Sequence, residues 1–89
     1  MISTRFEWDE NKRQANICKH RVDFEDAKEA FFGPMHVEVD QRREYGEERQ
    51  IGIGRSGAGT VVVVFTKRGD KVIRLISARK AGTDEIEGF

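Results

Sequence analysis

The sequence predicts an α+β fold in which two N-terminal helices pack on a mostly antiparallel sheet of four to five strands. Apolar residues recur at helical spacing over residues 24–31, and from Met35 onward they alternate with polar residues as in strands. The run Val61–Phe65 is apolar on both faces, which predicts the central strand. At 89 residues the chain has the length of one domain, so we expect residues 1–89 to share a single core.

The first element expected is a short strand at Thr4–Trp8, whose aromatic side chains should pack in the core rather than stack on bases. Asp9 has a typical N-cap side chain, because its carboxylate can accept from the free amides of a first helical turn. The helix it begins spans Glu10–Lys19 and carries Ala15 and Cys18 on a narrow apolar stripe. We therefore expect Cys18, the one cysteine of the chain, to be a small buried apolar side chain.

A second helix is expected after Asp23, and Gly33-Pro34 should end it because proline cannot continue the helical hydrogen bonding. The alternation in Met35–Asp40 predicts a strand with one wet face, on which His36 is expected to be solvated. The highly charged stretch Gln41–Glu48 should be an exposed loop.

A three-strand meander is the most strongly predicted part of the sheet. Its strands are Arg49–Arg55, Thr60–Thr66 and Lys71–Arg79, with a hairpin turn at Ser56–Gly59 and, after Lys80, a short helix or an unwound end. Gly52 and Gly54 leave one strand face bare, which suits either close helix packing or a shallow groove for a ligand. Simple alternation places Arg79 on the same face as Leu75 and Ser77.

Composition narrows the class of protein. No segment approaches the ~20 apolar residues of a membrane span, and the amino terminus lacks a signal-peptide core, so we expect a cytoplasmic protein that does not bind membranes. The net charge of zero hides a division: residues 1–48 carry 8 basic and 12 acidic residues (−4), and residues 49–89 carry 8 and 4 (+4). That asymmetry favours a polyanionic ligand at the basic half. The sequence shows no metal-ligand spacing or Cys/His cluster, so no metal is expected.

Several short motifs follow one another over residues 6–81. In the first half they are Phe6-Glu7-Trp8-Asp9, Asn11-Lys12, Asn16, Lys19-His20, Val22-Asp23-Phe24-Glu25-Asp26-Ala27 and Phe31-Phe32-Gly33-Pro34. In the second half they are Glu48-Arg49, Ile53-Gly54-Arg55-Ser56, a valine-rich strand ending in Phe65-Thr66, Arg68-Gly69-Asp70 and Ile76-Ser77-Ala78-Arg79-Lys80-Ala81. Each motif alone is weak evidence, but their order and spacing resemble the BrnT family of bacterial toxins.

The resemblance implies a fold like that of the RelE and ParE toxins and a metal-independent endoribonuclease, with no cofactor, that arrests translation. It also implies a heteromeric complex with a BrnA antitoxin, whose ribbon-helix-helix part binds operator DNA while its remainder neutralises the toxin. Operator DNA would then be bound only through the antitoxin. Family members commonly continue into a longer basic helix, whereas residues 83–87 here are acidic, which we expect to weaken RNA contact. The alternative is a non-catalytic, toxin-like module that binds the antitoxin and modulates its operator binding.

Metal-free RNA cleavage needs proton transfer and cations that stabilise the charged transition state. His20 is either such an acid–base group or simply a cation at a helix C-terminus. Arg79 is either a rim residue or a phosphate clamp, a role favoured by its place in the family motif. We expect catalysis from the set Arg79, His20 and Arg55, and RNA phosphate binding from the set Lys80, Lys19 and Arg49.

Overall fold

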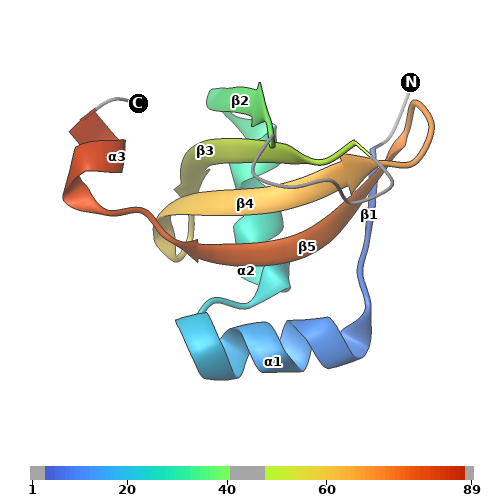
Figure 1. The fold of residues 1–89 in the computed structure, drawn as a ribbon, viewed down its shortest axis with the longest axis horizontal. Coiled ribbons are helices and arrows are strands. Elements are labelled where there is room, and N and C mark those ends of the chain that lie inside the picture. Colours follow the sequence, from blue (N-terminus) through green and yellow to red (C-terminus); the bar gives the residue numbers. More distant parts are fainter. Residues whose placement is uncertain (1–3, 41–47, 88–89) are drawn as a thin grey trace.

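A five-stranded mixed sheet, with strand order β1-β5-β4-β3-β2, forms the centre of the molecule (Figure 1). The computed structural model describes residues 4–40 and 48–87, so most of the predicted loop Gln41–Glu48 lies outside it. The strands are β1 (Arg5–Glu7), β2 (Met35–Val39), β3 (Gln50–Ser56), β4 (Gly59–Lys67) and β5 (Val72–Lys80). The helices are α1 (Glu10–His20), α2 (Phe24–Ala27), the 3-10 helix η1 (Lys28–Phe32) and α3 (Thr83–Glu87).

The α+β class and the antiparallel meander β3-β4-β5 are as predicted, while two details of the architecture differ. β1 runs parallel to β5, so the sheet is mixed. A third helix, α3, follows β5, where a short helix or an unwound end was predicted, so the helices are not confined to the N-terminal part. Local pattern cannot set the direction of a three-residue strand, since direction depends on which sheet edge it joins. Within the described residues, no helix is both long and apolar enough to cross a membrane.

The helix starts follow the predicted caps. The Asp9 carboxylate accepts from the backbone amides of Asn11 and Lys12, at 2.8 and 3.3 Å, where α1 begins. The Asp23 carboxylate accepts from the amide of Glu25 at 3.0 Å where α2 begins. Arg13 also donates to both oxygens of Asp23, at 2.8 and 2.9 Å, and holds the pKa of that carboxyl below its ordinary value. One side chain therefore links the middle of α1 to the start of α2.

α1 does not pack through the predicted apolar stripe. Ala15 and Cys18 are exposed, and Asn16 is the buried residue of this helix. α1 lies along the edge of β5 beyond the stretch paired with β1 (Figure 1). There Asn16 donates to the carbonyls of Val22 and Ala78, both at 2.8 Å, and accepts from the amide of Ala78 at 3.0 Å. A polar side chain is required at this position because the strand edge presents backbone groups that need partners.

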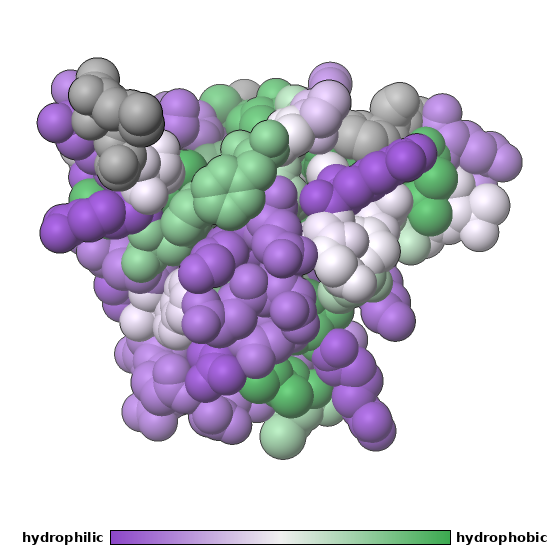
Figure 2. Space-filling model, turned by 180° about the vertical axis from the view of Figure 1, so that it is seen from behind, coloured by the Kyte–Doolittle hydropathy of each residue, from purple (hydrophilic) through white to green (hydrophobic). Residues whose placement is uncertain are grey.

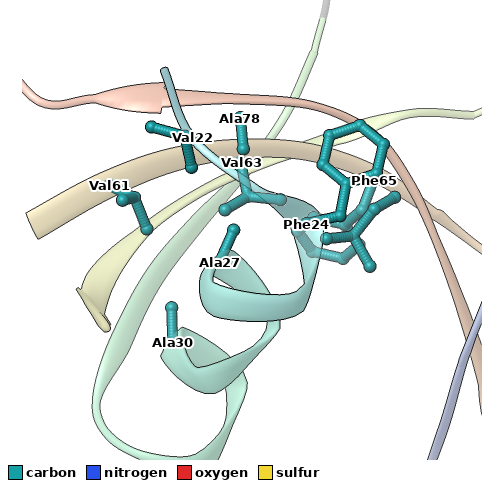
Figure 3. Close-up of a cluster of buried hydrophobic side chains, with 9 residues drawn as sticks. Val22, Phe24, Ala27, Ala30, Val61, Val63, Phe65 and Ala78 are labelled. Carbon is teal, nitrogen blue, oxygen red and sulfur yellow. The ribbon is translucent and has the colours of Figure 1, made fainter. Parts of the chain in front are cut away.

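The core lies between α2, η1 and one face of the sheet (Figure 3). Phe24, Ala27 and Ala30 are fully buried there, as their helical spacing predicts. A Cβ at Gly54 would lie 3.2 Å from the Cβ of Ala30, so this glycine lets η1 approach β3 closely. Close helix packing is therefore the interpretation observed at Gly54, whereas a Cβ at Gly52 would lie 2.7 Å from the Met35 sulfur and 3.3 Å from the Phe65 ring. Seen from behind, the molecule is hydrophilic over most of its surface, with scattered apolar patches (Figure 2).

The aromatic residues of the first segment pack as predicted. The ring of Phe6 lies 5.4 Å from that of Phe31, and the ring of Trp8 lies 5.8 Å from that of Phe24, centre to centre. Both residues are partly buried against the core cluster. Their role in packing therefore accounts for the aromatic motif at the start of the chain.

β2 departs from the expected burial. His36 is exposed as predicted, but Val37 and Val39, expected on the inward face, remain 43% and 47% exposed. Only Met35 packs against the core, where its side chain lies over Gly52. β2 is an edge strand of the sheet, so the helices that cover β3 and β4 do not reach most of its length.

Candidate functional site

A β-bulge in β5 decides which side chains face the helices. Ser77 lies opposite Val64 on β4, whereas Leu75 lies opposite Phe65, the next residue along β4. One extra residue is therefore inserted in β5, and the alternation of faces shifts by one position. Leu75 is buried in the core, while Arg79 points away from it, so the prediction that they share a face was wrong.

The sheet face opposite α2 and η1 carries two rows of side chains that cross from β2 to β5, and we call it the open face. Each row has a polar residue on β2, apolar residues on β3 and β4, and a polar residue on β5. One row is His36, Ile53, Val62 and Arg79, and the other is Glu38, Ile51, Val64 and Ser77.

A cavity of about 320 Å³ lies on the open face at the β5 end of these rows, and we call it the Arg79 cavity. Its lining residues are His20, Ile51, Val62, Val64, Ser77, Arg79 and Glu85. His20 comes from the last turn of α1, one turn after the buried Asn16 that fixes this helix to Ala78 of β5. Two residues of the predicted catalytic set, His20 and Arg79, thus line the same cavity.

Glu85 of α3 forms a forked ion pair with Arg79. The Arg79 Nη1 and Nη2 atoms donate to Glu85 Oε1 and Oε2 at 2.8 and 2.7 Å, and the Gly82 amide donates to Oε1 at 2.7 Å. These hydrogen bonds, those from Arg79 above all, lower the pKa of Glu85 from 4.5 to about 2. The acidic residues of this segment are evident in the sequence, but the pairing of Glu85 with Arg79 is not, since only the fold brings the two side chains together.

A second cavity, of about 210 Å³, adjoins the first on the open face, and we call it the His36 cavity. Ile51, Val62 and Glu85 line both cavities, and His36, Glu38 and Ile53 complete the second. The Nε2 atom of His36 lies 3.1 Å from Oε1 of Glu38, and both side chains are largely exposed. The open face therefore presents two adjoining hollows with an apolar floor between polar ends.

Comparison with protein families matches residues 8–85 to the model of the ribonuclease toxin BrnT of type II toxin–antitoxin systems. This chain belongs to the BrnT family. Its structure is similar to the 1.1 Å crystal structure of the Brucella abortus ribonuclease toxin BrnT, with a TM-score of 0.68 and 31% sequence identity. That match covers 91% of this chain and 100% of the Brucella chain. Comparison with curated proteins gave no match.

The other basic residues predicted to act in this BrnT-family toxin are spread around the sheet. Arg55 lies near the end of β3, two residues beyond Ile53 of the open face, and is absent from the lining of both described cavities. Arg49 precedes the opposite end of β3. Lys80 lies opposite the buried Val61, so strand alternation turns it away from Arg79. Lys19 is exposed in the last turn of α1, beside His20.

Donor groups for a metal ion do not gather in the described part of this BrnT-family structure. Within residues 4–40 and 48–87, no three side chains of His, Cys, Asp or Glu lie close enough together to hold an ion. Among the residues that line the two described cavities, Arg79 is the one arginine or lysine, and it lines the larger cavity.

Proposed function

We propose that this toxin cleaves RNA in the Arg79 cavity without a metal ion, with Arg79 binding the scissile phosphate and His20 transferring a proton. The observation that carries the proposal is the convergence of His20, Ser77 and Arg79 in one cavity on the sheet face opposite α2 and η1. A guanidinium fork matches two phosphate oxygens, and it keeps its charge at every physiological pH. Histidine is the side chain best suited to move protons near neutral pH.

The reaction that these groups suit is transesterification within the RNA chain. The ribose 2′-oxygen attacks the adjacent phosphorus and loses its proton, while the bond from phosphorus to the 5′-oxygen breaks and that oxygen gains a proton. The products are a 2′,3′-cyclic phosphate and a 5′-hydroxyl. His20 performs one of the two proton transfers, and Arg79 stabilises the negative charge that builds up on the phosphate oxygens.

The ion pair between Arg79 and Glu85 supports the choice of Arg79 as the anion-binding group. A carboxylate already occupies both arms of the guanidinium fork at 2.7–2.8 Å, the geometry in which arginine binds a phosphate. An RNA phosphate must displace Glu85 before it can bind in the same way. Lys19 and Arg55, exposed near this end of the sheet, are proposed to contact neighbouring phosphates of the RNA.

The test is cleavage of a labelled RNA by the purified protein in the presence of EDTA. Arg79→Ala should lower the cleavage rate by about 10²–10³-fold, and His20→Ala by about 10²–10⁴-fold, with the fold retained. Arg74→Ala is the matched control, because Arg74 also lies on β5 and also pairs with a glutamate, Glu7, at 2.7 Å. Full activity of Arg79→Ala, or loss of wild-type activity in EDTA, would contradict the proposal.

Membership of a type II toxin–antitoxin family implies an antitoxin partner. We propose that this partner is a BrnA-type protein whose ribbon-helix-helix part binds operator DNA, so that the toxin reaches the operator only within a heteromeric complex. We further propose that RNA cleavage arrests translation in the cytoplasm and that the fold is related to those of RelE and ParE. Co-expression with the neighbouring gene, followed by purification of the complex, tests the assignment of the partner.

The second candidate function is a non-catalytic module that binds the antitoxin and modulates its operator binding. The engagement of Arg79 by Glu85 favours it, since the carboxylate competes with an RNA phosphate for the same guanidinium. Expression without the antitoxin separates the two functions. Growth arrest with loss of RNA supports the ribonuclease, whereas normal growth together with tight antitoxin binding supports the module.

A further inference from the structure

The two cross-strand rows of the open face have the extent of a nucleotide. Neighbouring strands lie about 4.8 Å apart, so the three steps from β2 to β5 span roughly 14 Å between backbones. Arg79 lies at one end of its row and His36 at the other end. The two adjoining cavities lie over β3 and β4 between these ends, and together they offer space for a ribose and a base.

The floor of that space is apolar and partly accessible. Ile51 and Ile53 of β3 are half-buried, and Val62 of β4 lies between the two cavities and lines both. Flat aromatic bases pack well against such a surface, since each base has an apolar face and a polar edge. A base on this floor would turn its polar edge toward β2, where Glu38 lies directly opposite Ile51.

We propose that the His36 cavity is a base subsite that binds a guanine next to the phosphate held at Arg79. The inference rests on the proposed function, because it takes the Arg79 cavity as the phosphate site. The two cavities adjoin and share Ile51, Val62 and Glu85, so one nucleotide can occupy both at once. The site is specific for the base through the carboxylate of Glu38 and the imidazole of His36.

Guanine is the base that fits these groups. Its Watson–Crick edge presents two adjacent donors, N1–H and the N2 amino group, which can donate to the two oxygens of one carboxylate. Adenine and cytosine offer a single amino group beside an acceptor, and uracil offers one N–H between two carbonyls, so each leaves a carboxylate oxygen facing an acceptor or water. The Nε2 atom of His36 lies 3.1 Å from Oε1 of Glu38, and this contact orients the Glu38 carboxylate on the rim of the cavity.

Binding to 2′-O-methyl oligonucleotides tests the subsite without requiring cleavage. Four oligonucleotides that differ in one central base are compared by fluorescence anisotropy on the full chain. The guanine oligonucleotide should bind about tenfold more tightly than the others, the usual discrimination of a two-point base contact. Glu38→Gln should reduce this preference to about twofold or less, because an amide presents only one acceptor.

Glu25→Gln is the matched control, because Glu25 is an exposed glutamate that pairs at 3.0 Å with Lys28 on the helical side of the molecule. This variant should keep the full guanine preference, and thermal melts should show both variants folded. Equal binding of the four bases by the wild type overturns the proposal, and so does an unchanged preference in Glu38→Gln. Loss of antitoxin binding in Glu38→Gln, with RNA binding unchanged, would assign this surface to a protein partner instead.

Cleavage of chimeric substrates separates this proposal from the proposed function. A DNA strand with one ribonucleotide can be cut only after that ribose, so varying the base on each side of the scissile phosphate locates the preferred guanine. Guanine-selective binding without any cleavage would support the subsite and contradict the ribonuclease assignment. Cleavage that requires Arg79 but is equally fast with every base would support the ribonuclease assignment and contradict the guanine subsite.

Discussion

Replacement of Glu85 by glutamine tests whether the Glu85 carboxylate of α3 competes with RNA for the Arg79 side chain. Glu85 is bound to Arg79 through both oxygens, and α3 buries none of its five residues, so this pair is the main described tie between α3 and the site. Glutamine keeps the shape and can still accept from the Gly82 amide, but it loses the charge that competes with RNA. The variant should therefore bind RNA more tightly than the wild type.

The size of the effect follows from the ion pair. Both side chains are more than a third exposed, so the pair contributes at most ~1 kcal/mol after screening by solvent. A contribution of that size keeps the state with the Glu85–Arg79 pair formed about fivefold more populated than the state with the pair broken. Only the second state can bind a phosphate at Arg79, so the apparent affinity for RNA is reduced in proportion to its population. Removing the charge should then tighten RNA binding by up to about sixfold at 0.15 M salt.

The pKa of Glu85, about 2, sets the pH behaviour of this pair. Because the folded value lies below the ordinary 4.5, the stabilisation by the pair is present above pH 4.5 and is lost as pH falls toward 2. Between pH 5 and 8 the carboxylate stays ionised, so acidification in that range should not release Arg79. The gain in affinity of Glu85→Gln over the wild type should therefore stay constant across those values.

The assay is anisotropy with a 2′-O-methyl RNA, which binds but cannot be cleaved. Glu7→Gln is the matched control, because Glu7 pairs with Arg74 of the same strand at 2.7 Å and should leave the affinity unchanged. Unchanged or weaker binding by Glu85→Gln would refute the reasoning. A large fall in cleavage rate with tighter binding would instead assign Glu85 a part in catalysis.

Two further predictions concern stability. Arg21 ends α1 with φ 60°, a left-handed conformation that costs a non-glycine residue ~1–2 kcal/mol. Glycine removes this cost but loses ~0.5–1 kcal/mol of backbone entropy, so the net gain of ~1 kcal/mol in Arg21→Gly should raise the melting temperature by roughly 4–8 °C. Lys12→Gly, inside α1, should lower it instead, and a lower melting temperature for Arg21→Gly would contradict the argument. Asn16→Asp places a buried carboxyl against the carbonyls of Val22 and Ala78, which raises its pKa above the unfolded value. Stability should therefore be highest in acid and fall by ~3 kcal/mol as pH rises through that raised pKa, measured by urea unfolding. The exposed Asn11→Asp is its control, and equal pH profiles for the two variants would count against the assigned role of Asn16.

The sequence by itself determined the local structure and the family. Asp9 and Asp23 cap helices, and the hairpin around Gly57 joins two strands, because each depends on neighbouring backbone groups. The alternation from Met35 onward and the all-apolar Val61–Phe65 were sufficient to predict the meander and its central strand. Order and spacing of short motifs were sufficient for the resemblance to BrnT, which the family match confirms.

The tertiary structure alone decided which side chains meet. The apolar side chain of Cys18 predicted that this residue is buried, but Cys18 is exposed and Asn16 is buried in its place. The reason is that α1 lies against a strand edge, whose backbone groups need hydrogen-bond partners. The extra residue in β5 turns Arg79 to the open face, and no local pattern marks where a bulge will fall. Glu85 reaches Arg79 only when β5 and α3 are folded. Periodicity reports the faces of an isolated element, whereas a site depends on contacts between elements, and those contacts are set by packing of the whole chain.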